Sequence, residues 1–384
     1  MKIIVNRNEI LSHLSLANAI SSWNEKLDIP IIKNVLIQAY KSTLSMKTIS
    51  SGVCRCLSKI KNAEIISDGS ILINTKNLLE IIEKSEQDEI KLEKIDNSIL
   101  RLSYTGYETN LNILDWEQFP DFKINNNDLK NEISIFKSDI NFINKKVIFS
   151  STVESIFQQQ VHDSVQIDSE SYEGKIFFSF TNSIQLISWN KPYEGFKFKF
   201  CIQKDIFKNI EWLLKMNENT KIYLHENFFY VKNNFAVMEI KNWEEILGLS
   251  KFGNVTKIIR EKSLMYLEIN KKSLIKSLEK SLVFRSGKSK IIKFIISENK
   301  ITIKTNSEEI GNSKEEILVR TSGIKDGFDV NIDASYLLSI IKMFECENIE
   351  IGFGGQNSDV KVDPILIQDK SLKNYVQIIA LSVA

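Results

Sequence analysis

The sequence is poor in residues that interrupt regular structure. It contains 14 Gly and 4 Pro among 384 residues, so we expect few long irregular loops and no Pro-rich linkers. No run of apolar residues approaches the roughly 18 that suggest a membrane-spanning helix. Residues 1–5, MKIIV, form a strand pattern without the apolar stretch and cleavage site of a signal peptide. These absences favour a cytoplasmic globular protein with tightly joined domains and no membrane association.

Cysteine and histidine are also scarce. The four cysteines stand at positions 54, 56, 201 and 346, and the three histidines stand at positions 13, 162 and 225. Four cysteines cannot build a disulfide framework in a chain of this length, so we expect ordinary strand or core thiols. The histidines lie far apart with no cysteine pair nearby, which does not match the usual metal-ligand spacings. We therefore expect no metal and no other cofactor.

Motifs for catalysis are absent as well. The sequence has no phosphate-binding G-x-x-x-x-G-K-[ST] loop, no G-x-S-x-G nucleophile turn and no H-E-x-x-H zinc motif. The glycines of 352–355 stand next to strand patterns, where a hairpin turn explains them. We therefore expect a protein that is not an enzyme. The alternative is an enzyme in which acids such as Glu117 or Glu244 line a cleft, because paired carboxylates can perform acid–base chemistry.

The sequence does contain a pattern that recurs three times. An aliphatic residue, a short polar stretch able to cap a helix and an apolar stripe with steps of three or four occur at 5–11, 135–141 and 269–275. A second pattern of the same kind occurs at 73–79, 202–208 and 332–338. The spacing of roughly 130 residues is that of a domain able to bury its own core, not that of a short solenoid repeat. Each repeat is therefore predicted to contain two helices.

Between the predicted helices, apolar and polar residues alternate in runs of strand length. These runs cover 33–39, 90–93, 99–104, 221–223, 228–231, 291–296, 300–304 and 350–352. Polar turns such as Asn97-Ser98 and Glu298-Asn299 separate them, which favours hairpins and antiparallel sheets. The expected fold is α+β, with two helices packed on antiparallel sheets in each of three tandem domains. We expect these domains at residues 1–128, 129–256 and 257–384.

Charge alone does not identify a partner. The formal net charge is +1, which neither indicates nor excludes a polyanion. Lysines outnumber acids in 135–150, 202–216 and 269–283, whereas acids predominate in 73–88 and 332–345. If the predicted helices share one surface, its lysines would bind phosphates in a salt-sensitive way without reading bases. Ordinary solvated helix faces in a lysine-rich chain explain the same distribution.

Several segments resemble one protein family, the bacterial sliding clamp, which is the β subunit of the DNA polymerase III holoenzyme. Residues 1–11 are similar to its first strand and helix, and residues 28–35, DIPIIKNV, to the loop and strand that follow. Residues 114–121, LDWEQFPD, resemble the acidic Phe-Pro loop that closes its first domain and are the most specific match. Residues 363–367 and 375–379 resemble its final hairpin. The resemblance covers the whole chain, and the threefold pattern supports it independently.

This resemblance implies a head-to-tail homodimer that closes into a ring of DNA-clamp domains, with helices lining the hole and sheets outside. Such a ring encircles double-stranded DNA independently of its sequence and tethers the replicative polymerase, which confers processivity. The implied partners are the DNA polymerase III α subunit, the clamp loader and other proteins with a clamp-binding motif. The alternative within this fold is a clamp-shaped interaction scaffold with altered client specificity or without DNA loading.

The resemblance also implies residues that contact DNA. Lys26, in the loop before Pro30, and Lys204, at the start of a lining helix, match basic positions of the family. The equivalent helix starts in the other repeats carry Lys76, Lys137, Lys271 and Lys272, which extends the prediction by internal symmetry. We expect these lysines to contact phosphates rather than bases.

Clients of sliding clamps insert a short peptide into a hydrophobic pocket between the second and third domains. At the matching stretch, 181–186, this chain has TNSIQL where the family usually has Thr-Asp-Gly-His-Arg-Leu. The C-terminal wall at 376–382 lacks the Met-Pro and the basic residue that commonly end the family's chains. The predicted pocket residues are Thr181, Ser183, Ile184, Gln185, Leu186, Leu247, Phe252, Asp359, Val376, Gln377, Ile378, Ile379, Ala380 and Leu381. Loss of the Gly and Arg removes a permissive backbone site and a fork-shaped donor, so we expect altered peptide selectivity.

Overall fold

The computed structural model forms two compact units, each assembled from two segments that are separated in the sequence. It describes residues 1–22, 29–125, 129–148, 164–181, 185–217, 219–243, 263–284, 290–307, 309–324, 327–354, 364–372 and 374–379. Unit 1 contains Met1–Asn141 and Ile202–Ile246, and unit 2 contains Phe142–Cys201 and Leu247–Ala384. Each unit joins strands from both sides of a predicted domain boundary. The division into three domains at 1–128, 129–256 and 257–384 stays a prediction.

Unit 1 is built on two antiparallel sheets. Its strands are β1 (Lys2–Asn6), β2 (Asn34–Tyr40), β3 (Thr43–Ser50), β4 (Cys54–Ile60), β5 (Glu64–Ser67), β6 (Gly69–Asn74), β7 (Glu89–Lys94), β8 (Ile99–Tyr104), β9 (Tyr107–Asn112), β14 (Lys221–His225), β15 (Phe228–Lys232) and β16 (Ala236–Lys241). One sheet has the order β5-β1-β7-β8-β9 and the other has the order β14-β15-β16-β4-β3-β2-β6. The pairing of β16 with β4, which sets Met238 opposite Cys56, joins two distant parts of the chain.

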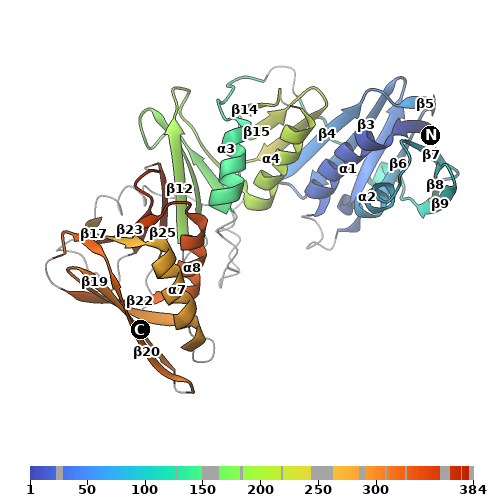
Figure 1. Cartoon of the computed structure of the whole chain (residues 1–384). Helices are drawn as coiled ribbons and strands as arrows, with labels where there is room; N and C mark the ends of the chain where they lie inside the picture. Colours follow the sequence, from blue (N-terminus) through green and yellow to red (C-terminus); the bar gives the residue numbers. More distant parts are fainter. Residues whose placement is uncertain are drawn as a thin grey trace. The chain divides into compact units, whose positions relative to one another are not determined.

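Three helices of unit 1 begin after polar residues that cap them. They are α1 (Arg7–Ser21), α2 (Thr75–Glu83) and α4 (Lys204–Met216), and the turns η2 (Pro30–Lys33) and η3 (Trp116–Gln118) are 3-10 helices. The side chains of Asn6, Asn74 and Gln203 accept hydrogen bonds from first-turn N–H groups, which would otherwise lack partners. Helices α1 and α4 pack against each other (Figure 1), and Asn209 Nδ2 donates to the Ala19 carbonyl at 2.7 Å.

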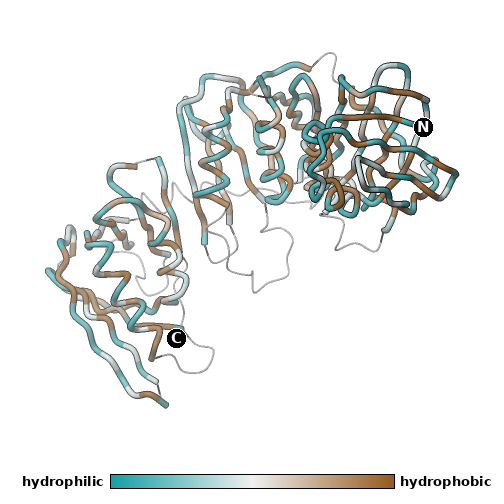
Figure 2. The backbone as a smooth tube through the Cα atoms, turned by 45° about the vertical axis from the view of Figure 1, so that its right-hand side comes forward, coloured by the Kyte–Doolittle hydropathy of each residue, from teal (hydrophilic) through white to brown (hydrophobic). Residues whose placement is uncertain are grey.

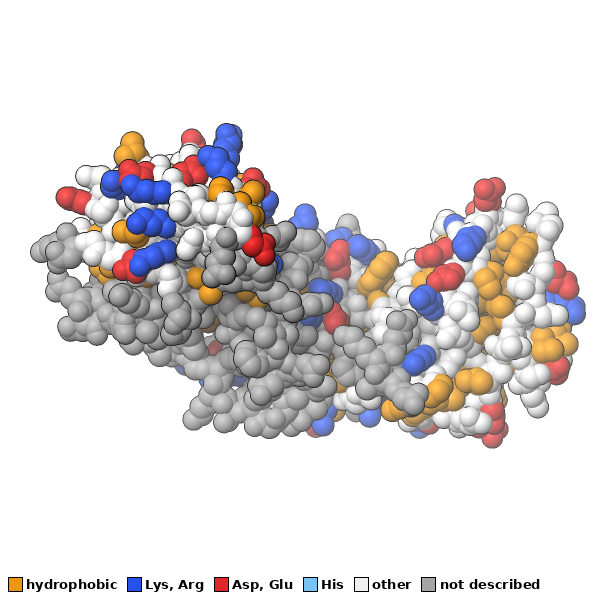
Figure 3. Space-filling model, turned by 90° about the horizontal axis from the view of Figure 1, so that it is seen from below, with side chains coloured by type: hydrophobic (Ala, Val, Ile, Leu, Met, Phe, Trp, Pro, Cys, Tyr) orange, Lys and Arg blue, Asp and Glu red, His pale blue; other side chains and the backbone are white. Residues whose placement is uncertain are grey.

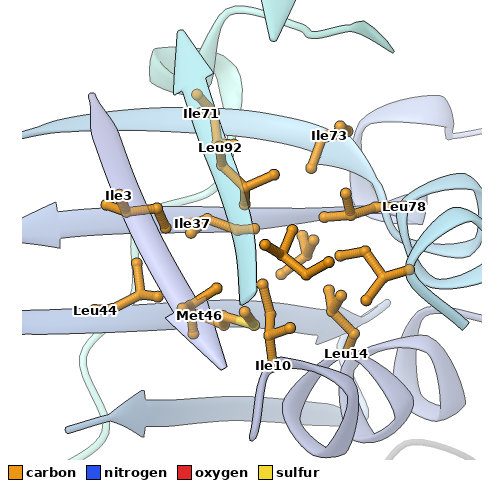
Figure 4. Packing of buried hydrophobic residues seen from close by; sticks show 14 of the residues in the cluster. Ile3, Ile10, Leu14, Ile37, Leu44, Met46, Ile71, Ile73, Leu78 and Leu92 are labelled. Atoms are coloured by element: carbon orange, nitrogen blue, oxygen red, sulfur yellow. The ribbon is translucent and has the colours of Figure 1, made fainter. Parts of the chain in front are cut away.

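The core of unit 1 forms where the apolar stripes of α1 and α2 meet alternate residues of the strands. Ile10 and Leu14 of α1 and Leu78 of α2 point toward Ile37 and Leu92 (Figure 4). Complete burial of such side chains contributes about 1.5–3 kcal/mol each. Figure 2 shows the underlying sequence pattern as alternating apolar and polar colour along the backbone. The period of this alternation therefore decides which face of each element is buried.

Unit 2 also contains two antiparallel sheets. Its strands are β10 (Ser164–Asp168), β11 (Lys175–Thr181), β12 (Gln185–Pro192), β13 (Lys199–Gln203), β17 (Ser263–Asn270), β18 (Ile291–Ser297), β19 (Lys300–Ser307), β20 (Gly311–Leu318), β21 (Arg320–Ser322), β22 (Phe328–Asp333), β23 (Asn348–Gly354), β24 (Ile365–Gln368) and β25 (Tyr375–Ile379). The larger sheet has the order β13-β10-β11-β12-β25-β24-β23-β17-β21, and the smaller has the order β20-β19-β18-β22. Strands before and after the predicted boundary at 256 thus meet at the β12–β25 pair.

Helices α7 (Lys271–Ser281) and α8 (Ala334–Met343) of unit 2 pack against each other and on the smaller sheet. A 3-10 turn, η7 (Leu282–Phe284), follows α7. The remaining helix, α3 (Lys137–Phe142), begins in unit 1 and continues as the π-helix η4 (Ile143–Ile148). Residues Ile143, Asn144 and Val147 have modest helix propensity, which is consistent with irregular winding at this point.

The structure confirms the main sequence predictions for the fold. All six predicted helices form, as α1, α3 and α7 from the first pattern and α2, α4 and α8 from the second. Every run predicted to be a strand lies in a β-strand except for Lys33, which belongs to η2, and the α+β class with antiparallel sheets is confirmed. Cys54, Cys56 and Cys201 are buried free thiols, as expected, and burial raises the pKa of Cys56 to about 12. Within the described ranges, no helix combines the length and apolar character needed to cross a membrane.

Candidate functional site

The predicted DNA-contacting lysines that the structure describes all lie in the first turn of a helix. They are Lys76 in α2, Lys137 in α3, Lys204 in α4, and Lys271 and Lys272 in α7. A lysine near a helix N-terminus opposes the helix dipole and typically costs about 0.3–1 kcal/mol. The helix dipole therefore does not explain these positions, whereas a lysine beside the N-terminal N–H groups suits an anionic ligand. Lys26 lies outside the described residues.

These lysines differ in how exposed their side chains are to solvent and therefore to a ligand. Lys76, Lys137 and Lys272 are exposed, whereas Lys204 and Lys271 are half-buried. The Lys271 ammonium donates a hydrogen bond to the carbonyl of Phe344, the C-cap residue of α8. A cation at a helix C-terminus interacts favourably with the dipole and with the unpaired carbonyls there. Lys271 therefore joins the start of α7 to the end of α8, in addition to any contact with DNA.

Arg7 has the same role in unit 1, which the sequence analysis missed. Its Nε donates to the Ile82 carbonyl at 3.2 Å and its Nη2 donates to the Glu83 carbonyl at 2.8 Å, both at the end of α2. The repeat patterns that begin at residues 5 and 269 align Arg7 with Lys271. This alignment was the available signal, because it places a cation at the same position of two repeats.

The predicted peptide pocket centres on the β12–β25 pair of unit 2. In its register Leu186 lies opposite Ile378, and Thr181 of β11 lies opposite Leu186. Leu186 packs with Val376 and Ile378 in one apolar cluster. Because residues directly opposite each other share a face of the sheet, Thr181, Leu186, Val376 and Ile378 converge on one face. The structure thus brings four of the predicted pocket residues together.

Three other predicted pocket residues lie on the opposite face of this strand pair. Gln185 faces Ile379, and Gln377 is the next residue of β25 on that side. All three are buried, with Gln377 fully inaccessible. These three residues therefore do not share the face that carries Leu186, because side chains of a strand alternate between faces, and their place in the pocket wall stays a prediction.

The buried glutamines belong to a hydrogen-bonded chain inside unit 2. Gln185 Nε2 donates to Gln377 Oε1 at 2.7 Å, and Gln377 Nε2 donates to the Tyr375 hydroxyl. The Tyr375 hydroxyl donates to the Lys146 carbonyl in η4 at 2.9 Å. Burial raises the pKa of Tyr375, which keeps this hydroxyl protonated as a donor. Hydrogen bonds between buried polar groups restrict the arrangement of their neighbours, so this chain of bonds joins β12, β25 and η4.

Sequence reasoning also missed two apolar residues beside the predicted pocket. Tyr266 of β17 and Leu366 of β24 belong to the same cluster as Leu186. Lys370 forms ion pairs with Glu268 at 2.9 Å and with Glu350 at 3.3 Å, two acids on the same face of the sheet as Tyr266. No sequence signal pointed to these residues, because only the strand order β12-β25-β24-β23-β17 places them along one face. The face offers apolar contact next to carboxylates.

The other predicted pocket residues lie outside the described part of the chain. They are Ser183, Ile184, Leu247, Phe252, Asp359, Ala380 and Leu381. Of the acids considered for catalysis, Glu117 is exposed on η3, and Glu244 lies outside the described residues. Where the structure describes side chains, no group of three or more His, Cys, Asp or Glu residues is arranged to hold a metal ion. On the face shown in Figure 3, basic and acidic side chains are interspersed.

Two family models match the chain. The model for the N-terminal domain of the DNA polymerase III beta subunit matches residues 1–124, and the model for its C-terminal domain matches residues 256–381. The chain is 22% identical to the beta sliding clamp of Mycoplasma pneumoniae, over 93% of this chain and 94% of that protein. It is 24% identical to the beta sliding clamp of Rickettsia felis, over 96% of each chain.

Solved structures are similar over the whole chain. The DNA polymerase III beta subunit of Thermotoga maritima has a TM-score of 0.84 at 15% identity and aligns with 100% of this chain and 99% of that chain. The DNA polymerase sliding clamp of Bacillus subtilis has a TM-score of 0.81 at 19% identity, again over 100% of this chain and 99% of that chain. At these identities the structural likeness establishes the fold.

Proposed function

Because the chain belongs to the DNA polymerase III beta subunit family, we propose that it is a DNA sliding clamp. In this proposal two copies close into a ring around duplex DNA and tether the replicative polymerase and other clients in the cytoplasm, without a catalytic step of their own. The observation that carries the proposal is the nearly full-length match to proteins named beta sliding clamp. The threefold recurrence of a helix pair supports it, because such repeats can line a ring.

The proposed contact with DNA is electrostatic. The exposed lysines Lys76, Lys137 and Lys272 are suited to weak phosphate contacts, and phosphate contacts carry no sequence information directly. Weak contacts of this kind permit sliding, and the closed ring prevents dissociation. Each phosphate contact adds to the salt dependence of binding, since binding releases condensed counterions.

The proposed ring closure uses two unpaired sheet edges. β9 is an edge strand in unit 1 and β20 is an edge strand in unit 2. An edge strand exposes backbone N–H and C=O groups that can pair with a second chain. Tyr107 on β9 is 40% exposed and Leu318 on β20 is 84% exposed, so both edges also offer apolar contact. We propose that β9 of one copy pairs with β20 of the next, which gives a closed head-to-tail dimer.

The client site in this proposal is the apolar face formed by Leu186, Val376 and Ile378. Leu186 and its neighbour Tyr266 are half-buried and supply the accessible apolar contact, whereas Leu366, Val376 and Ile378 are buried. Glu268 and Glu350 flank it, and both pair with Lys370, so this side of the face carries two carboxylates and one cation. The proposed clients are the polymerase α subunit, the clamp loader and other proteins with a clamp-binding motif.

Retention on circular DNA tests the proposed function. The purified chain would be loaded onto a nicked plasmid with its matching clamp loader and separated by gel filtration at moderate salt. A clamp remains on the circle and is released when a restriction enzyme linearises the plasmid. Light scattering on the same preparation should give the mass of a dimer, and Leu318→Asp at the proposed interface should shift it toward the monomer. Loss that does not depend on linearisation would contradict a topological mode of binding.

The same experiment distinguishes a DNA sliding clamp from the alternative, a clamp-shaped interaction scaffold. A clamp-shaped scaffold would bind client peptides through Leu186 and Ile378 but would not be retained on circles. The altered sequence at 181–186 motivates this second candidate. Peptide binding that is lost in Leu186→Asp, together with no retention on DNA, would favour the scaffold.

A further inference from the structure

The outer face of the smaller sheet of unit 2 carries a row of lysines. In its register Lys293 of β18 lies opposite Lys304 of β19, and Lys304 lies opposite Lys314 of β20. Asn331 of β22 lies opposite Lys293 and extends the row across all four strands of this sheet. Along β18, exposed residues such as Lys293 alternate with buried residues such as Phe294. The three lysines therefore stand side by side on one solvent-facing surface.

Such a row is unfavourable for the sheet by itself. Like charges directly opposite each other on neighbouring strands are destabilising. Asp329 pairs with Lys293 at 2.9 Å, and Glu316 is shared between Lys314 at 2.9 Å and Lys300 at 3.2 Å. Lys304, in the middle of the row, has no ion-pair partner among the described residues. One cation is thus left between two paired neighbours.

A concave surface surrounds this lysine. It is an open hollow of about 630 Å³, lined by the lysine row together with Ile291, Asn306, Asn312 and Asn331. Ile291 is 45% exposed and lies opposite Asp333 at the end of β22. The volume is within the usual range for ligand sites, about 300–1,000 Å³. The hollow therefore combines one unpaired cation, amide groups and an exposed apolar side chain.

The arrangement of the acids decides which kind of ligand fits. Asp329 and Glu316 stand on one side of the lysine row. Ile291, Asn306 and Asn312 stand on the other, together with Asp333, whose carboxylate is engaged as the N-cap of α8. A nucleic acid with a charge at every phosphate would meet the two carboxylates as it crossed the face. A peptide can instead place one carboxylate on Lys304 and an apolar side chain on Ile291, and avoid the acids. Charge complementarity therefore favours a protein segment.

We propose that this surface, defined by Lys293, Lys304, Lys314 and Ile291, is a docking site for a short acidic–apolar peptide segment of a partner protein. The carboxylate of the segment pairs with Lys304, and its neighbouring apolar side chain packs on Ile291. Asn306 and Asn312 can donate to backbone carbonyls of the bound segment. The site lies on a face of the sheet, so it remains available whether or not the β20 edge pairs with a second copy. It does not depend on DNA binding.

Peptide binding to the full chain tests this proposal. The probe is a short fluorescein-labelled peptide with one Glu next to one Leu in an otherwise neutral sequence, compared with the same peptide carrying Gln in place of Glu. We expect saturable, salt-sensitive binding of the Glu peptide alone, measured by fluorescence anisotropy. Lys304→Glu should weaken it by roughly threefold to tenfold, on the scale of one exposed ion pair and its reversal. Lys304→Arg should retain binding, because the cation is kept.

A matched control is Lys175→Glu, which reverses an exposed lysine on the larger sheet of unit 2. It should leave peptide binding unchanged, and circular dichroism should give the same melting temperature for the Lys304 variants and the original chain. Absence of saturable binding, equal binding of the Gln peptide, or an equal loss in Lys175→Glu would overturn the proposal. So would a duplex oligonucleotide whose binding falls in Lys304→Glu as much as that of the peptide, because the surface would then recognise phosphates.

Discussion

The helix pair α1–α2 of unit 1 and the helix pair α7–α8 of unit 2 share the residues that define them. Asn6 caps α1 and Asn270 caps α7 with their side-chain oxygens. The buried stripe of α1 contains Ile10, His13, Leu14 and Ala17, and that of α7 contains Leu274, Ser277, Leu278 and Ser281 at the same spacing. The two pairs also use a first-turn cation, Arg7 or Lys271, to bind the end of the second helix.

The two pairs differ at the positions between these shared residues. His13 stands where α7 has Ser277, so a titratable ring is buried in one helix and a hydroxyl in the other. Asn8 stands where α7 has Lys272, and α7 also carries Lys276 and Lys280 on its surface. The N-cap residue, the buried stripe and the first-turn cation are thus the shared features that stabilise each helix pair. The exposed face and the polar group in the stripe are free to vary and give each pair its own chemistry.

The largest expected difference is sensitivity to acid in α1. His13 is 2% exposed, and burial lowers its pKa from 6.5 to about 4. As the pH falls below 6.5 the unfolded chain binds a proton that the folded chain takes up only near pH 4. Stability is therefore complete above the unfolded pKa and decreases by about 3 kcal/mol across this window. Urea unfolding from pH 7 to 4 measures it.

Two variants isolate this effect from the titration of carboxylates. The His13→Gln variant should lose about 3 kcal/mol less unfolding free energy between pH 7 and pH 4 than the original chain, because the glutamine amide does not titrate. Ser277→His should introduce a similar loss in α7. An unchanged pH dependence in His13→Gln would mean that the ring is protonated in the folded chain.

The next largest difference concerns the cation that joins each helix pair. Arg7 makes two hydrogen bonds to backbone carbonyls, whereas Lys271 makes one to Phe344. Arg7→Met should lower the free energy of unfolding by about 2–3 kcal/mol and Lys271→Met by about 1–2 kcal/mol, since bonds from charged donors are the stronger kind. Urea unfolding gives both values. Arg7→Lys serves as control and should recover about half of the loss; equal losses in both Met variants would contradict the comparison.

The helix caps should respond equally in the two pairs. Asn6→Ala and Asn270→Ala each remove a side-chain acceptor for first-turn N–H groups and should cost about 1 kcal/mol. Asn6→Ser and Asn270→Ser should retain most of the stability, because serine caps helices well. Chemical denaturation measures the four variants. Losses that differ by more than twofold would show that the caps are not equivalent.

The smallest expected effect on stability concerns the exposed faces of α1 and α7, which differ at Asn8 and Lys272. Lys272→Ala should leave the chain stable or raise its stability by about 0.3–1 kcal/mol, since it removes a cation from a helix N-terminus. In the proposed clamp it should also weaken DNA binding and reduce the slope of log K against log salt by about one. The converse variant, Asn8→Lys in α1, should steepen that slope. Titrations of duplex DNA at several salt concentrations measure both; an unaltered slope in Lys272→Ala would exclude it as a phosphate contact.

The sequence alone determined the elements of this protein. Polar caps followed by apolar steps of three and four predicted all six helices, and alternation predicted eight of the described strands, because both signals depend on hydrogen bonds and faces within a few residues. The threefold recurrence of these signals indicates a triplicated α+β chain, since each copy is long enough to bury a core. Among the described helices, α3 departs from a regular α-helix, because a π-helix follows Phe142.

Tertiary structure decided which residues meet. The pairings of β4 with β16 and of β12 with β25 join strands that lie far apart in the sequence, and no local signal specifies them. The register of β12 with β25 then turned Leu186 toward one face and Gln185 toward the other, because a strand alternates its side chains and one residue of offset exchanges the faces. For the same reason Lys271 could be recognised from sequence as a basic helix start, but its bond to Phe344 follows only from the packing of α7 on α8.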